Sequence, residues 1–350
     1  MQRYIDFSKK RNTFAKKIKK NLKRRNMKGI IGIGNAITDI MTVLPDENLL
    51  QQINFPKGSM QLVDEKTIQH IEQLTQQLPK TLKSGGSVAN TMYGIASFNF
   101  PTAYIGKIGH DEIGNFYKAD MEQQGVKCYF SLSELTSGKA IAMITPDSER
   151  TFATYLGAAS ELKPEEINPS WLDSYAIMHI EGYLIFNRDL VLHIAKMAKD
   201  KGMLISYDLA SYNIVADNLD FIKNFMKDYV DIVFANEEEA KAFTGKSPEA
   251  SLDELADYCT YAIVKIGKEG SLIKHNNTTY KIPAIKANAI DTTGAGDWYA
   301  SGFLYGLCNQ LPIETSGKIA ALLAGNVIEH IGAKIPQEKL NQVIDMAKKL

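Results

Sequence analysis

The sequence predicts an α/β protein built on a central, mostly parallel sheet. From about residue 175 onward, short apolar segments typical of strands alternate with helical patterns. The expected strands lie at 176–180, 203–208, 231–235 and 262–266, and the helices between them at 187–199, 219–227 and 237–243. Apolar strands that alternate with helices are typical of βαβ units, in which helices cover both faces of the sheet. With 350 residues, 45% of them hydrophobic, the chain can bury a core without disulfides.

Before this regular region, up to about residue 155, the pattern mixes strands and helices. The apolar run at 29–34 opens the folded part, and strands are expected at 103–109, 140–145 and 151–156. A further strand at 271–275 pairs loosely with 262–266. The last 57 residues, from Gly294, have a largely helical pattern with breaks near Pro312 and Pro336. No repeat or long linker divides the chain, which indicates one main domain.

Charge is distributed unevenly along the chain. The net charge is zero, but residues 1–25 carry eleven Lys and Arg and one acid, Asp6, so this segment is +10 and the remainder −10. We expect residues 1–27 to be a basic, flexible tail and 28–345 to form the folded domain. A nucleic-acid or membrane-surface arm, an organelle-targeting segment and a true start at Met27 remain alternatives for the tail.

Several protein classes are excluded by composition. The three cysteines, Cys128, Cys259 and Cys308, are far apart and odd in number, which favours a reducing, cytoplasmic location and argues against a zinc site. No apolar run reaches the roughly 18–20 residues that a membrane helix needs. The acidic folded part has no clustered basic and aromatic residues, so we expect no nucleic-acid partner.

The most informative motif is the run Asp291-Thr292-Thr293-Gly294-Ala295-Gly296-Asp297, which precedes an apolar helical pattern. Small residues let the backbone approach a ligand closely, and the N–H groups of Gly294, Ala295 and Gly296 at a helix start favour an anion. The Asp297 carboxylate at the same helix start suits a base that takes a proton from an attacking hydroxyl. A glycine loop before a helix also occurs without any ligand, but this string is long and specific.

The motif resembles the C-terminal signature of the ribokinase-like (PfkB) family of sugar and nucleoside kinases, with Tyr299 where phenylalanine is usual. The N-terminal signature is present as Ser84-Gly85-Gly86-Ser87-Val88-Ala89-Asn90, and the resemblance covers about residues 28–340. Three further segments are most similar to the adenosine-kinase-like branch: 34–40, 56–64 and 150–159. The resemblance implies a three-layer ribokinase-like fold with a small β-sheet lid, inserted near 35–62 and 100–155.

The resemblance also implies a set of substrate-binding residues. Asn35 and Asp39 would hydrogen-bond the vicinal hydroxyls of a ribose, although a strand-end turn also explains them. Gly85 and Gly86 would let a sugar ring lie against the backbone, although Ser84 or Ser87 as a helix cap is the alternative. The remaining substrate-binding candidates are Ser87, Asn90, Gln61 and Arg150, whose planar fork suits a transferring phosphate.

The nucleotide side is implied in the same way. Asn236 and Glu239 would hold Mg²⁺, mainly through water, although acids in the first turn of a helix are common for other reasons. Further candidates for binding ATP are Gly267, Gly270, Thr292 and Asn326. Activation by K⁺ is left open, since Asp291 and Thr293 fall in the loop where some family members bind it.

We therefore expect a kinase that uses ATP and Mg²⁺ to phosphorylate a primary hydroxyl of a small molecule. Adenosine is the first candidate substrate, on branch resemblance alone, and a PfkB-type sugar kinase for ribose, fructose or a keto-deoxy sugar is the alternative. A non-catalytic nucleoside-binding protein is a third reading, against which the intact motif argues. The sequence leaves both a monomer and a homodimer open.

Overall fold

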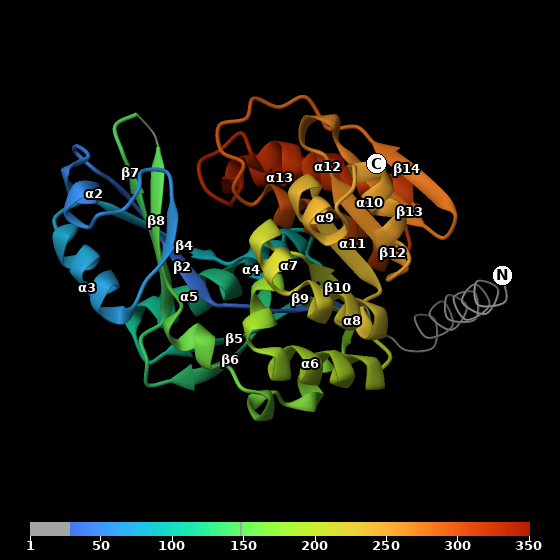
Figure 1. The fold of residues 1–350 in the computed structure, drawn as a ribbon, viewed down its shortest axis with the longest axis horizontal. Coiled ribbons are helices and arrows are strands. Elements are labelled where there is room, and N and C mark those ends of the chain that lie inside the picture. The colour runs from blue at the N-terminus through green and yellow to red at the C-terminus, as the bar shows by residue number, and fades with distance from the viewer. Residues whose placement is uncertain (1–28, 148) are drawn as a thin grey trace.

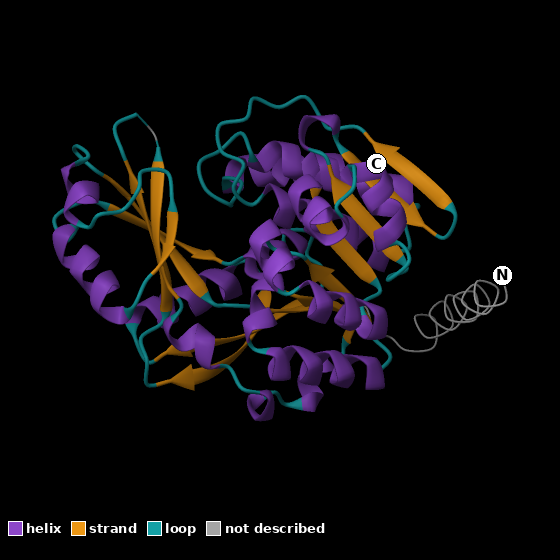
Figure 2. Ribbon diagram, in the orientation of Figure 1, coloured by secondary structure: helices purple, strands orange, loops and turns teal. Residues whose placement is uncertain are grey.

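Two β-sheets organise the chain in this computed structural model (Figure 1). The model describes residues 29–147 and 149–350, so the predictions for the basic segment 1–27 and for Met27 lie outside the described residues. One sheet has nine strands and the other five. The larger sheet carries helices on both faces, and the smaller one forms a lid beside it (Figure 2). This arrangement is the ribokinase-like α/β fold that the sequence predicts.

The nine-stranded main sheet is parallel except at one edge. Its order is β14-β13-β12-β11-β10-β9-β1-β5-β6, with β13 and β14 antiparallel to their neighbours. The strands are β1 (Gly29–Ile33), β5 (Thr102–Gly109), β6 (Val126–Ser133), β9 (Tyr175–Ile180), β10 (Leu204–Asp208), β11 (Ile232–Asn236), β12 (Tyr261–Lys265), β13 (Ser271–His275) and β14 (Thr278–Ile282). The strands and helices predicted beyond residue 175 are therefore confirmed.

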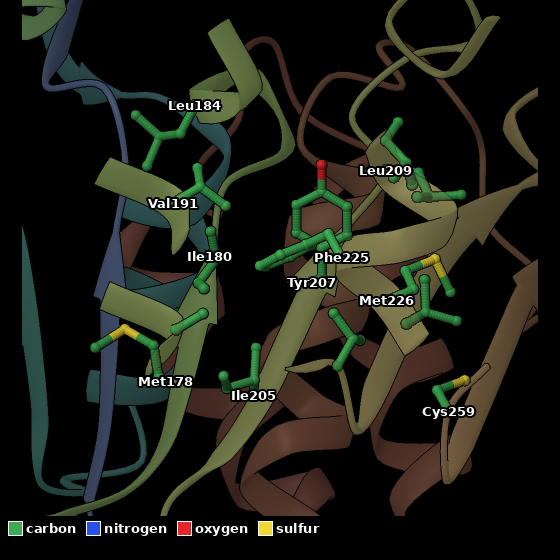
Figure 3. Close-up of a cluster of buried hydrophobic side chains, with 14 of the residues drawn as sticks. Met178, Ile180, Leu184, Val191, Ile205, Tyr207, Leu209, Phe225, Met226 and Cys259 are labelled. Carbon is green, nitrogen blue, oxygen red and sulfur yellow. The ribbon is translucent and has the colours of Figure 1, made fainter. Parts of the chain in front are cut away.

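Helices bury both faces of the main sheet because its strands are apolar on both sides. One face packs on α6 (Arg188–Asp200), α8 (Leu219–Tyr229), α9 (Glu237–Thr244) and α10 (Pro248–Leu255). The other packs on α4 (Ser87–Ala96), α5 (Glu112–Gln123), α11 (Ala295–Cys308) and α12 (Ile313–Val327). Figure 3 shows the first of these cores, where Ile205 and Tyr207 of β10 pack with Phe225 and Met226 of α8. The remaining helices on this domain are α7 (Tyr212–Asp217) and α13 (Gln337–Ala347).

The five-stranded lid sheet has the order β3-β8-β7-β2-β4. Its strands are β2 (Ile37–Val43), β3 (Met60–Leu62), β4 (Lys80–Gly85), β7 (Gly138–Ile144) and β8 (Arg150–Tyr155). One face packs on α2 (Asn48–Gln52) and α3 (Glu65–Leu74) through a small core that includes Ile40, Ile68 and Ile141. We call this the outer face of the lid, and Figure 1 shows both helices on the side away from the main sheet.

The observed lid differs in part from the predicted segments 35–62 and 100–155. Residues 102–133 form β5, α5 and β6, which belong to the main sheet, because Thr102–Gly109 is buried along its whole length and pairs with β1. Residues 80–85 add the lid strand β4, whose partly polar sequence gave no strand signal.

Candidate active site

Polar side chains gather at the carboxyl edge of the main sheet. β1 lies between β9 and β5, so the order of the strands reverses there, and ligands bind at such switch points in open α/β sheets. Residues at or just beyond the carboxyl ends of five strands meet at this edge: Asn35, Glu181, Asp208, Asn236 and Lys265. The first turns of α4 and α11 reach the same edge, since Ser87 and Asn90 of α4 bond Asp297 of α11.

Asp297 lies in the first turn of α11 and is held by two side chains of α4. Ser87 Oγ donates to one carboxylate oxygen at 2.8 Å, and Asn90 Nδ2 donates to the other at 2.9 Å. Burial raises the pKa of Asp297 to about 7, although these two hydrogen bonds lower it. A carboxyl group that titrates near neutral pH suits a general base. The structure thus brings Ser87, Asn90 and Asp297 together, as the two signatures predict.

The three small residues before Asp297 form the turn into α11. Gly294 precedes the helix in the left-handed conformation, with φ +79°, and a Cβ there would approach Ala333 within 2.8 Å. Ala295 and Gly296 are the first helical residues, and the N–H of Ala295 donates to the Thr292 carbonyl at 3.2 Å. The N–H groups of a first turn have no acceptor within their own helix, and the positive end of the helix dipole favours an anion. We refer to this helix start, beside the Asp297 carboxylate, as the anion site.

Asn35 is fixed by a buried glutamate that the sequence analysis did not single out. Glu181, 2% exposed at the end of β9, accepts a bond from Asn35 Nδ2 at 2.8 Å and another from its backbone N–H at 3.2 Å. Its second oxygen accepts from the N–H of Val88, at the start of α4, at 3.4 Å. Burial raises the pKa of Glu181 to about 7. Glu181 therefore joins β1, β9 and α4 and orients the Asn35 amide.

A second polar cluster follows β10, β11 and β12. Asn236 and Glu239 bond each other reciprocally as a capping box at the start of α9, with the Asn236 Oδ1 accepting from Glu239 N at 2.8 Å. Burial raises the pKa of Glu239 to about 7. The Lys265 ammonium lies 3.5 Å from Asp208 Oδ2. Burial lowers the pKa of Lys265, but the facing Asp208, Glu239 and Asp297 raise it above its ordinary value.

Asp39 comes from the lid and lies against the glycine pair. A Cβ at Gly85 would come within 2.4 Å of the Asp39 carboxylate, and a Cβ at Gly86 within 2.6 Å of the Asn35 carbonyl oxygen. Gly86 also has φ +93°, so both positions require glycine. Burial raises the pKa of Asp39 to about 6, and Lys334 and Lys83 lower it. The predicted pair Asn35 and Asp39 therefore lies beside the Gly85-Gly86 turn.

Arg150 joins the lid to the loop before the anion site. Its guanidinium pairs with the carboxylate of Asp291, and the two side chains are only 16% and 8% exposed. Asp291 also accepts bonds from the N–H of Thr293 at 3.1 Å and of Gly332 at 2.6 Å. Burial raises the pKa of Asp291, but Arg150 and these donors hold it below its ordinary value. Arg150 thus points from β8 toward the main sheet, and we call its side of the lid sheet the inner face.

Gln61 does not lie on this inner face, in contrast to the prediction. It is directly opposite Ala153, whose side chain belongs to the outer core, and its amide bonds Ser59 Oγ at 3.1 Å. Directly paired residues of neighbouring strands share a face, so the pleat directs Gln61 away from the main sheet and Met60 toward it. Of the two neighbouring residues, Met60 and not Gln61 therefore lies on the inner face.

The predicted nucleotide residues lie in three different segments of the chain. Gly267 and Gly270 flank a turn after β12. A Cβ at Gly270 would lie 2.0 Å from the carbonyl oxygen of Ile282 in β14, so this packing is by itself sufficient reason for a glycine there. Thr292 is exposed, and its carbonyl accepts from Ala295 N at 3.2 Å. Asn326 is buried in α12 and donates to the Leu322 carbonyl of its own helix.

Comparison with known proteins identifies the family. The family model described as pfkB family carbohydrate kinase matches residues 58–340. The chain belongs to this family. It is 25% identical to the adenosine kinase of Saccharomyces cerevisiae, over 89% of this chain and 98% of that one. Two crystal structures are similar. A probable sugar kinase from Rhizobium etli has a TM-score of 0.82 and 31% identity, covering 93% of this chain and 99% of that one. The adenosine kinase from Sinorhizobium meliloti has a TM-score of 0.81 and 32% identity, covering 92% of this chain and 99% of that one.

As a pfkB kinase, the protein is a phosphotransferase with an alcohol group as acceptor. Three charged residues at its carboxyl edge escaped the sequence analysis: Glu181, Asp208 and Lys265. Each lies at or directly after the last position of an apolar strand, so a search for charged residues at the ends of predicted parallel strands finds all three. Of the helices in residues 29–147 and 149–350, none has both the length and the apolar character needed to cross a bilayer.

Proposed function

We propose that this pfkB kinase transfers the γ-phosphoryl group of ATP to a primary hydroxyl of a nucleoside, with adenosine as the first candidate. The observation that favours a nucleoside over a free sugar is the apolar inner face of the lid. Val43, Met60 and Leu62 are large apolar residues that are 62%, 54% and 64% exposed. Such exposure on the strands next to a substrate site calls for a ligand with an apolar surface.

The register of the lid sheet supports placing these three side chains on the substrate side. Met60 is directly opposite Phe152, and Leu62 opposite Thr154. Through β8, β7 and β2 the same rows continue to Met41 and Asp39. Val43 shares this face of β2 because side chains alternate along a strand.

A nucleoside matches this combination of a carboxylate and apolar side chains. Its ribose would offer vicinal hydroxyls to Asp39 and Asn35, and its base would present two flat faces to Met60, Leu62 and Phe152. A free sugar carries hydroxyls around the whole ring, and those covered by Met and Leu would lose their hydrogen bonds to water, which is costly. The apolar face therefore favours a ligand with one polar and one apolar part.

The proposed reaction uses Asp297 as the base and the start of α11 as the anion site. Asp297 takes the proton of the primary hydroxyl as its oxygen attacks the γ-phosphorus. The N–H groups at Gly294, Ala295 and Gly296 stabilise the negative charge on the transferred group. Closure of the lid would exclude water, which otherwise competes as the acceptor.

Mg²⁺ is the expected companion of ATP, and the side chains near the anion site suit it. The amide of Asn236 and the carboxylates of Glu239 and Asp208 provide the oxygen ligands that this ion prefers, directly or through water. Among the described residues, no three His, Cys, Asp or Glu side chains form a metal cage. Mg²⁺ usually takes most of its ligands from phosphates and water, so this set fits. When bound, the ion neutralises charge on the phosphates.

The test is ADP release from Mg-ATP by the purified protein with a panel of acceptors: adenosine, inosine, cytidine, ribose, fructose and 2-keto-3-deoxygluconate. We expect turnover with a nucleoside at a higher kcat/KM than with ribose. Turnover with free sugars alone would overturn the nucleoside assignment and support the sugar-kinase alternative. Binding of a nucleoside without turnover on any acceptor would support a non-catalytic protein.

A further inference from the structure

Lys265 occupies a position at the anion site that the family motifs do not explain. It is the last residue of β12, directly opposite Asn236 of β11, and its side chain is 17% exposed. A Cβ built on Gly296 would lie 2.9 Å from the Lys265 Nζ. Among the described residues, and apart from the chain neighbours of Gly296 and the backbone of its own helix, only atoms of the Lys265 side chain come within 4 Å of that point. The ammonium group therefore lies directly over the first turn of α11.

This position is electrostatically unusual. The start of a helix carries a partial positive charge, so an ammonium group placed against it is repelled. Among the described residues, Asp208 is the one hydrogen-bond partner of Lys265, at a long distance of 3.5 Å. An ammonium group has three donors, which leaves capacity for another acceptor. The carboxylates of Asp208, Glu239 and Asp297 offset the repulsion. The unused donors of the ammonium beside a helix start favour an anion between the two.

We propose that Lys265 is a catalytic residue whose ammonium binds the γ-phosphoryl group together with the N–H groups of Gly294, Ala295 and Gly296. The proposal rests on the proposed transfer from ATP. Lys265 and α11 would contact different oxygens of the transferred group, because they approach it from β12 and from the helix start. Asp208, behind Lys265, positions the ammonium through its ion pair.

The step is a displacement at phosphorus. The acceptor oxygen forms a bond to the γ-phosphorus while the bond between this phosphorus and the bridging oxygen to the β-phosphate breaks. ADP leaves with the electron pair of the broken bond, and Asp297 receives the hydroxyl proton. Negative charge builds up on oxygens of the transferred group and on the leaving oxygen, and the Lys265 ammonium stabilises it without giving up a proton.

The experiment compares Lys265→Met, Lys265→Arg and the wild-type protein, with Lys281→Met as the matched control. Lys281 is an exposed lysine of the edge strand β14. Methionine keeps the length and the apolar stem of Lys265 and removes its charge. We expect kcat at saturating Mg-ATP to fall about 10²–10³-fold in Lys265→Met, the range for loss of one such contact. Arginine should restore part of the rate, since it keeps the charge in a different shape.

Binding measurements separate this role from a merely structural ion pair. Calorimetry with ADP and with a non-hydrolysable ATP analogue should show that Lys265→Met loses affinity for the analogue and keeps that for ADP. Equal losses for both nucleotides, accompanied by a lower melting temperature, would show that Lys265 only neutralises buried carboxylates. A kcat equal to that of Lys281→Met would also overturn the proposal.

The outcome does not depend on the nucleoside assignment. If the wild-type protein uses a sugar from the panel, the same kcat comparison is made with that sugar, and only the assigned substrate fails. If it uses no acceptor in the panel, the role of Lys265 is tested by the ratio of the affinity for the ATP analogue to the affinity for ADP. An unchanged ratio in Lys265→Met then counts against Lys265, and a ratio shifted toward ADP supports it.

Discussion

The main sheet and the inner face of the lid approach the substrate with different chemistry. On the main-sheet side, helix starts and carboxylates are already fixed by protein partners: Asp297 by Ser87 and Asn90, and Asn35 by Glu181. On the lid side, large apolar side chains are more than half exposed. Asp39 and Arg150 are turned toward the main sheet, and Lys83, directly opposite Asp39, shares their face.

This difference assigns separate tasks to the two sides. A preorganised set of dipoles and carboxylates stabilises a transition state at little cost in reorganisation, so the main-sheet side suits phosphoryl transfer. A ligand that covers an exposed apolar surface gains binding free energy from its burial, so the lid is suited to selecting the acceptor. Substitutions on the main-sheet side should lower kcat, and those on the lid should raise KM.

The largest effect is expected for Asp297→Asn. The amide cannot accept the hydroxyl proton, so kcat should fall about 10²–10⁴-fold, the range for removal of a general base. Asparagine keeps the shape of the side chain, and acceptor KM should change little. Initial rates of ADP release measure both constants. In the wild-type protein, kcat/KM should rise with pH through about 7 as Asp297 loses its proton.

The matched control is Asp220→Asn in the first turn of α8. This variant removes a carboxylate from the start of another helix, away from the anion site, and should keep the wild-type rate. A similar kcat in Asp297→Asn and wild type would contradict the assignment of the base. A large rise in KM at constant kcat would instead make Asp297 a binding residue.

The next largest effect separates the two faces of one lid strand. Met60→Ala removes apolar surface from the inner face and should raise KM for the nucleoside about 10-fold, within the range for lost apolar contacts in a substrate pocket. Gln61→Ala, its neighbour on the outer face, should leave KM unchanged because its amide bonds only Ser59. Steady-state kinetics of both variants measure KM for the nucleoside. A larger effect of Gln61→Ala would restore the role predicted from the sequence.

Gln61 also illustrates what the sequence could and could not predict. The regular strands after residue 175 and the two glycine signatures are local patterns, so the strands of the main sheet and the candidates Asn90 and Asp297 follow from them. The hydrogen bond between these two residues spans 207 positions and does not. The face of a three-residue strand depends on its register with β8, which is a contact across about 90 residues. A shift of one residue in that register exchanges the two faces.

The same reason explains the residues that were missed. Glu181 and Lys265 lie in or after apolar strands whose local pattern signals only burial. Their roles come from neighbours in the sheet: Glu181 meets Asn35 across 146 residues, and Lys265 meets Asp208 across 57. Strand order sets these contacts, and no local pattern contains it.

A smaller effect is expected where the two sides meet, at Arg150 and Asp291. Asp291→Ala leaves the N–H groups of Thr293 and Gly332 without their acceptor and should lower the free energy of unfolding by about 2–3 kcal/mol. Arg150→Ala removes the contact from the lid but leaves both N–H donors with their acceptor, so it should cost about 1 kcal/mol. Urea unfolding measures both losses. Equal losses of unfolding free energy in the two variants would mean that the Arg150 contact accounts for the whole stabilisation by Asp291, and that the Thr293 and Gly332 bonds add nothing to it.

The smallest effect concerns stability against pH and compares two aspartates. In the fold Asp297 has a pKa of about 7, well above its ordinary value, so the folded protein retains a proton that the unfolded chain releases between pH 4 and 7. Stability from this group therefore falls as pH rises through that window. Asp297→Asn has no carboxyl group at this position and does not lose this stability. The melting temperature of the variant minus that of the wild type should therefore increase from pH 5 to pH 8.

Asp147, in the hairpin between β7 and β8, is the control of opposite sign. Hydrogen bonds from Lys57 and Thr145 lower its pKa to about 2. Its contribution to stability is present above pH 4 and is lost only as pH falls toward 2, so Asp147→Asn should differ from the wild type by a constant amount between pH 5 and 8. Melting curves at four pH values test both variants. A constant difference for Asp297→Asn as well would mean that its carboxyl group is ionised throughout this range, and the base would then act without a raised pKa.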